Sequence, residues 1–227
     1  MHQSALINAT SFFQNYVTQG TDKVAIEIGA QDVNGSLRQI APDGLKYIGV
    51  DFVQGKGVDV VLDDPYVLPF ENESIDICLC SSVLEHSEMF WIVFLEVLRI
   101  LKSDGLFYLN VPSNGDFHRY PVDCWRFYPD SGKALLRWAE RNGYKPSLLE
   151  SFVSSQVGTV WNDFVAVYVK DESHVNAYPN RILHTKKDFI NGYVLNNDDL
   201  LNYSQFVEDQ KKMLAIKQII DNAIKVL

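Results

Sequence analysis

The stretch from Lys23 to Asp51 constrains the fold of this chain more than any other. A short β-rich apolar run, Lys23–Ile28, stops at Gly29, and after a loop and a short helical pattern at residues 36–40 a second apolar run ends in Asp51. In an open parallel sheet, ligands bind beyond the carboxyl ends of the strands, where glycine lets the backbone approach and an acid on the second strand can bind ribose hydroxyls. The stretch therefore predicts an α/β fold with a site for a nucleoside-containing cofactor.

The glycine pattern of this loop separates two kinds of cofactor. A dinucleotide site needs G-x-G-x-x-G, and here Gln31 and Asn34 stand at the second and third glycine positions. Glu27 precedes the first glycine, where its carboxylate would repel a pyrophosphate. S-adenosylmethionine, a sulfonium compound with an α-amino group, meets no such repulsion.

The same residues resemble a known family. An acid-x-Gly loop followed by an acid that ends the next strand resembles the class I S-adenosylmethionine-dependent methyltransferases, and the stretch GAQDVNGSLR, residues 29–38, resembles an uncharacterised branch of their type 11 group. Asp64 stands where the family has an acid that accepts a hydrogen bond from the adenine amino group. Pro65 departs from the pattern because it lacks the backbone N–H that usually binds the adenine ring, and the N–H of Tyr66 is the neighbouring substitute.

The resemblance implies a cofactor pocket at the carboxyl ends of the first four strands. In this pocket Asp51 would bind the ribose, Phe52 would lie against the adenine, and Ser81 would face the methionine end. The full set of expected cofactor-binding residues is Glu27, Gly29, Ala30, Gln31, Asp51, Phe52, Asp64 and Ser81.

The later segments predict the rest of the sheet. A buried crossover helix at residues 90–102 leads through a Ser-Asp-Gly turn to a fifth strand at residues 106–111, which resembles the family's most specific mark. Two further strand candidates, at residues 144–152 and 160–169, are joined too closely for a crossover helix and must pair antiparallel. We therefore expect a Rossmann-like seven-stranded, mostly parallel sheet with helices on both faces and an antiparallel last strand. That closing hairpin also excludes a nicotinamide oxidoreductase.

The chain divides into two parts in this interpretation. Residues 1–170 are expected to form the methyltransferase domain, and residues 171–227 a C-terminal helical extension. Apolar residues recur at a roughly helical spacing from 198 to 227, which predicts one long helix or two. We expect this extension to lie as a flap against the domain, with a homodimer contact or a lid over the substrate mouth as alternatives.

A long polar and aromatic loop, residues 112–129, follows the fifth strand, and loops of this length in compact domains are usually functional. Its His-x-x-Pro-x-Asp-x-x-Arg-Phe pattern resembles the same uncharacterised branch, in which the loop lies where substrates enter. His118 in the loop and His86 after the fourth strand are the candidate catalytic bases, because imidazole titrates near neutral pH. Asp116 and Asp123 are candidate orienting groups.

The amino-acid composition limits the kinds of partner that this chain is expected to bind. The chain has 20 basic and 29 acidic residues, a net charge of −9, and no basic cluster that would follow a phosphate backbone. Nucleic acid is therefore an unexpected partner. The absence of a long apolar run predicts no membrane partner and a cytoplasmic location. No carboxylate cluster is evident, so no metal site is expected.

The leading hypothesis is methyl transfer from S-adenosylmethionine to a small-molecule or glycan acceptor. O-methylation is one form of it, since an alcohol acceptor would benefit from a general base. Tyr120, Trp125 and Tyr128 could stack on a sugar or an aromatic ring. The competing hypothesis is a catalytically silent S-adenosylmethionine-binding regulatory or interaction protein.

Overall fold

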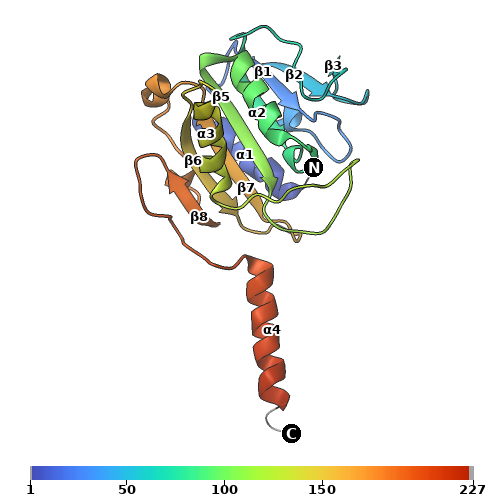
Figure 1. The fold of residues 1–227 in the computed structure, drawn as a ribbon, viewed down its shortest axis with the longest axis vertical. Helices are drawn as coiled ribbons and strands as arrows, with labels where there is room; N and C mark the ends of the chain where they lie inside the picture. Colours follow the sequence, from blue (N-terminus) through green and yellow to red (C-terminus); the bar gives the residue numbers. More distant parts are fainter. Residues whose placement is uncertain (1, 225–227) are drawn as a thin grey trace.

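The sheet at the centre of the molecule has eight strands, in the order β3-β2-β1-β4-β5-β7-β6-β8 (Figure 1). The computed structural model describes residues 2–224. Strands β1 to β5 are mutually parallel and span Val24–Ile28, Lys46–Asp51, Val60–Val61, Ile75–Ser81 and Leu101–Pro112. The remaining strands pair antiparallel with their neighbours and span Ser147–Ser154 (β6), Asp163–Val169 (β7) and Phe189–Val194 (β8).

Helices cover both faces of this sheet, as the sequence predicts. Helix α1, Gln3–Tyr16, lies on one face, and α2, Phe90–Ile100, and α3, Ser131–Arg141, lie on the other (Figure 1). Successive residues of β5 alternate between the two cores: Phe107 packs with α2 and α3, whereas Tyr108 packs with α1. This alternation follows from the period of two along a strand. Short 3₁₀ helices complete the fold at Leu37–Ile40 (η1), Leu84–His86 (η2), Glu172–Ala177 (η3) and Ile182–His184 (η4).

The elements differ from expectation in two places near the middle of the chain. The crossover helix ends at Ile100, because Leu101 already adopts an extended conformation and pairs with Ile75 of β4. Strand β3 is reduced to two residues. Before it, the Asp59 carboxylate accepts a hydrogen bond from the Gly49 backbone N–H, 2.7 Å away, where a strand partner would otherwise bind.

The C-terminal part corrects the expected strand number from seven to eight. Residues 189–194 form β8, which pairs with β6 and extends the sheet by one strand. Helix α4, Glu208–Ile224, is present as expected, but it projects from the sheet instead of lying on it as a flap (Figure 1). None of its described side chains is buried. Among the described residues, no helix combines the length and apolar character that a membrane span requires.

Candidate functional site

The loop after β1, residues 29–35, crosses the carboxyl edge of the sheet in a tight turn; we call it the cofactor loop. Gly29 has a φ of +76°, and a Cβ added there would lie 2.2 Å from Val83 Cγ2. The backbone N–H groups of Gly29 and Ala30 both donate to the Val50 carbonyl, at 2.8 and 3.1 Å. Glycine is therefore required at position 29 by its positive φ and by the close approach of Val83.

Asp51 is the last residue of β2 and lies directly beside this loop. Its carboxylate accepts one hydrogen bond from the Gln31 backbone N–H and another from the Val53 backbone N–H, each at 3.1 Å. The side chain is buried, whereas the neighbouring Phe52 is 47% exposed. Two backbone donors thus orient the carboxylate and leave further acceptor capacity on both oxygens.

Glu27 is held under the cofactor loop, on the α1 side of the sheet. The Tyr47 hydroxyl donates to its carboxylate at 2.7 Å, and the backbone N–H of Leu37 also donates to it. Burial raises the pKa of Glu27 to about 7, against the opposing effect of these two donors. Glu27 is thus a carboxyl whose charge changes near neutral pH.

Asp64 and Ser81 differ in their surroundings. Asp64 is exposed and accepts a hydrogen bond from the Tyr66 backbone N–H at 2.8 Å. The N–H that we expected to replace the donor missing at Pro65 is therefore already occupied. Ser81 is buried at the end of β4, and its hydroxyl has no hydrogen-bond partner within residues 2–224.

Another buried polar group, Asn110 of β5, lies next to Ser81 in the sheet register. Its amide has partners on the α1 side of the sheet, because Oδ1 accepts a hydrogen bond from Asn8 Nδ2 at 3.1 Å and the side chain also bonds to Asp163. Leu79 and Tyr108, two residues earlier on each strand, pack in the α1 core, so Ser81 and Asn110 share that face with Glu27. Unsatisfied buried polar groups are costly and rare in folded proteins, so the Ser81 hydroxyl is a candidate ligand contact.

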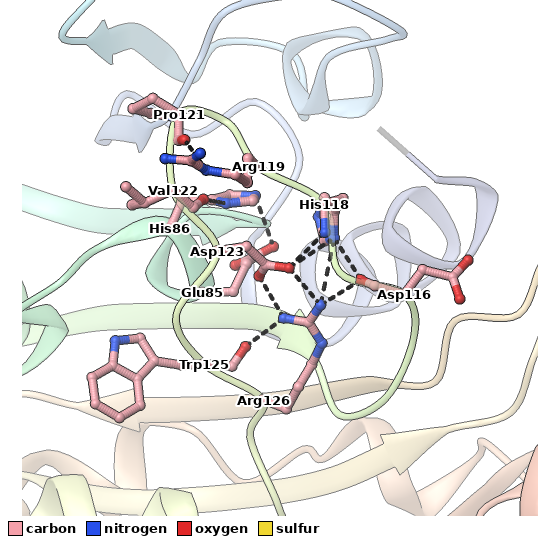
Figure 2. Close-up of polar contacts among 10 residues, drawn as sticks. All are labelled: Glu85, His86, Asp116, His118, Arg119, Pro121, Val122, Asp123, Trp125 and Arg126. Atoms are coloured by element: carbon pink, nitrogen blue, oxygen red, sulfur yellow. Dashed lines mark hydrogen bonds and ion pairs between the residues drawn. The ribbon is translucent and has the colours of Figure 1, made fainter.

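The loop of residues 113–130 links β5 to α3 and is fastened by an ion pair; we call it the acceptor loop. Arg126 contacts Asp123 through two hydrogen bonds, Nη1 to Oδ1 at 2.6 Å and Nη2 to Oδ2 at 2.9 Å, and Nη2 also donates to the Asp116 carbonyl at 2.6 Å (Figure 2). These bonds hold the pKa of Asp123 down, at about 2. The same carboxylate accepts the His118 backbone N–H at 2.7 Å.

The acceptor loop brings its histidine against η2. The rings of His86 and His118 meet edge to face with their centroids 4.9 Å apart. His86 Nδ1 lies 2.5 Å from the Val122 carbonyl, and the backbone N–H groups of Cys124 and Trp125 donate to the Glu85 carbonyl at 2.7 and 3.2 Å. Burial lowers the pKa of His86. Both candidate histidines thus lie in one cluster (Figure 2).

The acceptor loop also reaches the cofactor loop. The Tyr120 hydroxyl donates to the Gln31 side-chain oxygen at 2.8 Å. A hollow of about 250 Å³ lies farther along the acceptor loop, lined by Gly115, Phe117, Asp123, Cys124, Trp125 and Arg126. The two loops therefore form a continuous surface at the carboxyl edge of the sheet.

Three residues of the site are absent from the sequence-based candidates, namely Asn110, Arg126 and Glu85. Arg126 binds Asp123 three residues earlier, a spacing that the matched loop pattern contains. Glu85 is 1% exposed and precedes His86, and burial raises its carboxyl pKa to about 8. Arg126 could have been found from its spacing, but the burial of Glu85 depends on the distant acceptor loop covering it.

Strand order and site together define the fold of the class I methyltransferases, and comparisons with known proteins agree. Residues 11–109 match the family described as a methyltransferase domain. An uncharacterized methyltransferase of Mycobacterium avium is 31% identical over 139 residues, which are 53% of this chain and 54% of the relative. This chain thus spans about half the length of the curated relatives that it matches.

Solved structures share the fold at low sequence identity. The 1,6-didemethyltoxoflavin-N1-methyltransferase of Burkholderia thailandensis, with bound S-adenosylhomocysteine, superposes with a TM-score of 0.56 and 16% identity over 75% of this chain and 80% of that one. The cyclase SpnF has a TM-score of 0.54 and 15% identity over 74% of this chain and 82% of that one. In residues 11–109 and in its fold this chain is therefore similar to the class I methyltransferases, the class whose cofactor is S-adenosylmethionine.

Proposed function

We propose that this chain transfers the methyl group of S-adenosylmethionine to a hydroxyl oxygen of a small molecule. The observation that carries this proposal is the hydrogen bond between Tyr120 and Gln31, because it joins the acceptor loop to the cofactor loop. Methyl transfer needs the acceptor within about 3–3.5 Å of the methyl group. Two loops fastened at one edge of the sheet provide the arrangement that this reaction requires.

The residues at the carboxyl edge of the sheet, in and beside the cofactor loop, fit S-adenosylmethionine; we call this part of the site the cofactor edge. Asp51 presents an oriented carboxylate to ribose hydroxyls, and Gly29 leaves the backbone uncovered where the loop turns. Ser81 offers a hydroxyl that lacks a partner among the described residues, next to the amide of Asn110. When bound there, the cofactor supplies an electrophilic methyl group on its sulfonium. Glu27, Ala30, Gln31, Phe52 and Asp64 complete the proposed binding set.

His118 is the residue that we assign to removing the proton from the acceptor. Its side chain is 38% exposed, and Nδ1 lies 3.1 Å from the Asp116 carbonyl. An Nδ1–H bonded to this carbonyl leaves Nε2 as the proton acceptor. His86 is more enclosed, with a side chain 12% exposed, and its Nδ1 is engaged by Val122. His86 is therefore assigned to shaping the site beside His118.

Aromatic side chains on the acceptor loop favour an acceptor with a flat or sugar-like ring. Phe117, Tyr120 and Tyr128 are 76%, 55% and 66% exposed, and Trp125 lines the hollow. Rings of this kind contribute contact area and stack on ligand faces. A glycan acceptor is the narrower form of the proposal.

A catalytically silent cofactor-binding protein is the alternative, and one observation favours it. The fold is shared with a structure named as a cyclase, so fold likeness by itself does not fix methyl transfer. One observation distinguishes the silent protein from a methyltransferase: the silent protein would bind the cofactor but would methylate no acceptor.

A two-part experiment tests the proposal. A thermal-shift panel of S-adenosylmethionine, S-adenosylhomocysteine and NAD should show stabilisation by the first two only, worth about 2.7 kcal/mol at a hundredfold excess over the dissociation constant. Incubating the chain with labelled S-adenosylmethionine and a metabolite extract should then label a small molecule. Stabilisation by NAD alone would contradict the cofactor, and binding without any labelled product would favour the silent alternative.

Helix α4 supports the further proposal of a homodimer. Met213, Ile216 and Ile220 are 68%, 57% and 51% exposed and follow one another at helical spacing. Pairing with a second copy would cover this apolar stripe. Light scattering should give twice the chain mass for the wild type and the monomer mass for Ile216→Lys/Ile220→Lys, whereas a monomeric wild type would refute the dimer.

A cytoplasmic location stays a prediction.

A further inference from the structure

Three metal-ligating groups meet beside the proposed acceptor position. One ligand atom each from Glu85, His86 and His118 lies within 4.8 Å of the other two. Glu85 and His86 belong to η2, and His118 comes from the acceptor loop (Figure 2). Residues far apart in the sequence are therefore brought together by the fold.

The hydrogen bonds of His86 leave one ring nitrogen free for a ligand role. Nδ1 lies 2.5 Å from the Val122 carbonyl, so it carries the proton and donates. Nε2 then keeps its lone pair and lies 3.8 Å from Glu85 Oε1. Histidines that bind metals usually donate the other ring N–H to a carbonyl or a carboxylate in this way.

The Nδ1 atom of His118, like that of His86, lies close to a backbone carbonyl. Its Nδ1 lies 3.1 Å from the Asp116 carbonyl and 3.5 Å from Asp123 Oδ2. Arg126 also approaches this ring, with Nη2 3.5 Å from Nδ1, but its charge is balanced by its two hydrogen bonds to Asp123. With the charges of Arg126 and Asp123 paired, Glu85 is the remaining acidic group of the cluster.

Glu85 supplies an independent reason to expect a cation. Its Oε2 is buried and has no hydrogen-bond partner in the described part of the chain, and the residue is 1% exposed. Leaving a buried carboxylate oxygen without a donor is expensive. A bound metal ion would satisfy this oxygen.

We propose that Glu85, His86 and His118 bind a divalent first-row transition metal ion, such as Mn²⁺, Co²⁺ or Zn²⁺. Two imidazoles and one carboxylate suit these ions, whereas Mg²⁺ and Ca²⁺ prefer ligand sets made only of oxygen. Ligand bonds of about 2.0–2.2 Å require the three atoms to move slightly closer together. The half-exposed His118 on its loop is the group that moves.

The inference deepens the proposed function and rests on it for the role of the ion. Three protein ligands leave coordination positions open toward the acceptor, and a hydroxyl bound there loses its proton more readily. That proton passes to solvent, and the oxygen forms its bond to the methyl group as the bond from the methyl group to sulfur breaks, which leaves S-adenosylhomocysteine. In the ion-bound protein His118 is a ligand, and after chelation it returns to the role of base.

Cobalt binding tests the site without relying on activity. We would titrate Co²⁺ into the chelator-treated full chain, without a histidine tag, and follow visible absorption and heat. We expect one Co²⁺ per chain, displaced by Zn²⁺ but not by an equal concentration of Mg²⁺. His118→Ala should lower the Co²⁺ affinity at least about tenfold, the range for losing part of a metal site. His184→Ala is the matched control, because His184 is exposed and lies in η4, outside the cluster.

The results of these Co²⁺ titrations either support the metal site or overturn it. No Co²⁺ binding, or an equal loss in the His118→Ala and His184→Ala variants, would overturn it. Glu85→Gln, checked for folding by circular dichroism, should also lose Co²⁺; a folded variant that binds it as tightly as the wild type would overturn the site. S-adenosylhomocysteine binding is measured on the same samples. A chain that binds this ligand and methylates after chelation, yet takes no Co²⁺, would keep the proposed function and lose only the metal.

Discussion

The cofactor loop and the acceptor loop meet at one edge of the sheet but are held by different forces. The cofactor loop is fixed by main-chain hydrogen bonds, with Gly29 and Ala30 both donating to Val50. The acceptor loop also has main-chain bonds, from Cys124 and Trp125 to Glu85, but it depends in addition on side-chain charge, through the bonds of Arg126 to Asp123. Single side-chain substitutions can therefore release the acceptor loop while the cofactor loop keeps its shape. This difference makes cofactor binding and catalysis separable by mutation.

The largest effect is expected at His118, on the acceptor side. His118→Ala should lower kcat about 10²–10⁴-fold, the range for losing a general base, while S-adenosylmethionine affinity stays within about threefold. Turnover with the acceptor found by labelling and calorimetric titration of the cofactor measure the two quantities. Near wild-type turnover of the variant between pH 6 and 9 would show that His118 is a structural loop residue.

Arg126 tests the charge that fastens the acceptor loop. Arg126→Ala removes the charge-assisted hydrogen bonds to Asp123, and we expect the free energy of unfolding to fall by about 1–3 kcal/mol. Urea denaturation measures this change, and hydrogen exchange should increase in the acceptor loop but not in the cofactor loop. Arg119→Ala is the control on the same loop, since Arg119 is exposed and donates only to the Pro121 carbonyl at 3.2 Å. Equal effects of the two variants would contradict the role of the ion pair.

Glu27 tests the cofactor side through its dependence on pH. The folded chain keeps the Glu27 proton up to a pKa of about 7, whereas the ordinary value is 4.5. The folded state therefore binds more protons between these values, and stability falls as pH rises from 4.5 to 7. Glu27→Gln has no such proton, so between pH 5 and 7 the wild type should lose about 1–3 kcal/mol relative to it. Parallel urea midpoints of the two proteins across this range would refute the raised pKa.

Local patterns in the sequence predicted most of the sheet. The strand ends at Gly29 and Asp51 depend on residues within a few positions, so they are readable from the sequence. Strand β8 was missed because Asn191 and Gly192 interrupt its apolar alternation, and its partner β6 lies about forty residues earlier. The predicted position of α4, as a flap against the domain, was wrong for another reason. An apolar stripe predicts a helix equally well whether it packs on its own domain or projects from it.

The candidate site likewise has residues that local sequence patterns predict and residues that only the structure reveals. Asp51 and Gly29 follow a pattern of neighbouring positions, and the structure places both at the carboxyl edge of the sheet. The cluster of Glu85 with His118 depends on the acceptor loop folding back across η2. No spacing in the sequence encodes that contact, so Glu85 became visible only in the structure. The prediction that the cofactor loop belongs to one uncharacterised branch stays a prediction.

Titration of S-adenosylhomocysteine into the wild type and into Asp51→Ala tests the central claim most directly. Asp51 is the oriented carboxylate of the cofactor edge, and bonds of its kind to ligand hydroxyls contribute roughly 1.5–3 kcal/mol each. The wild type should bind one ligand per chain, and Asp51→Ala should bind it at least about tenfold more weakly. Equal affinities for the two proteins, or no binding by the wild type, would contradict a cofactor site at this edge of the sheet.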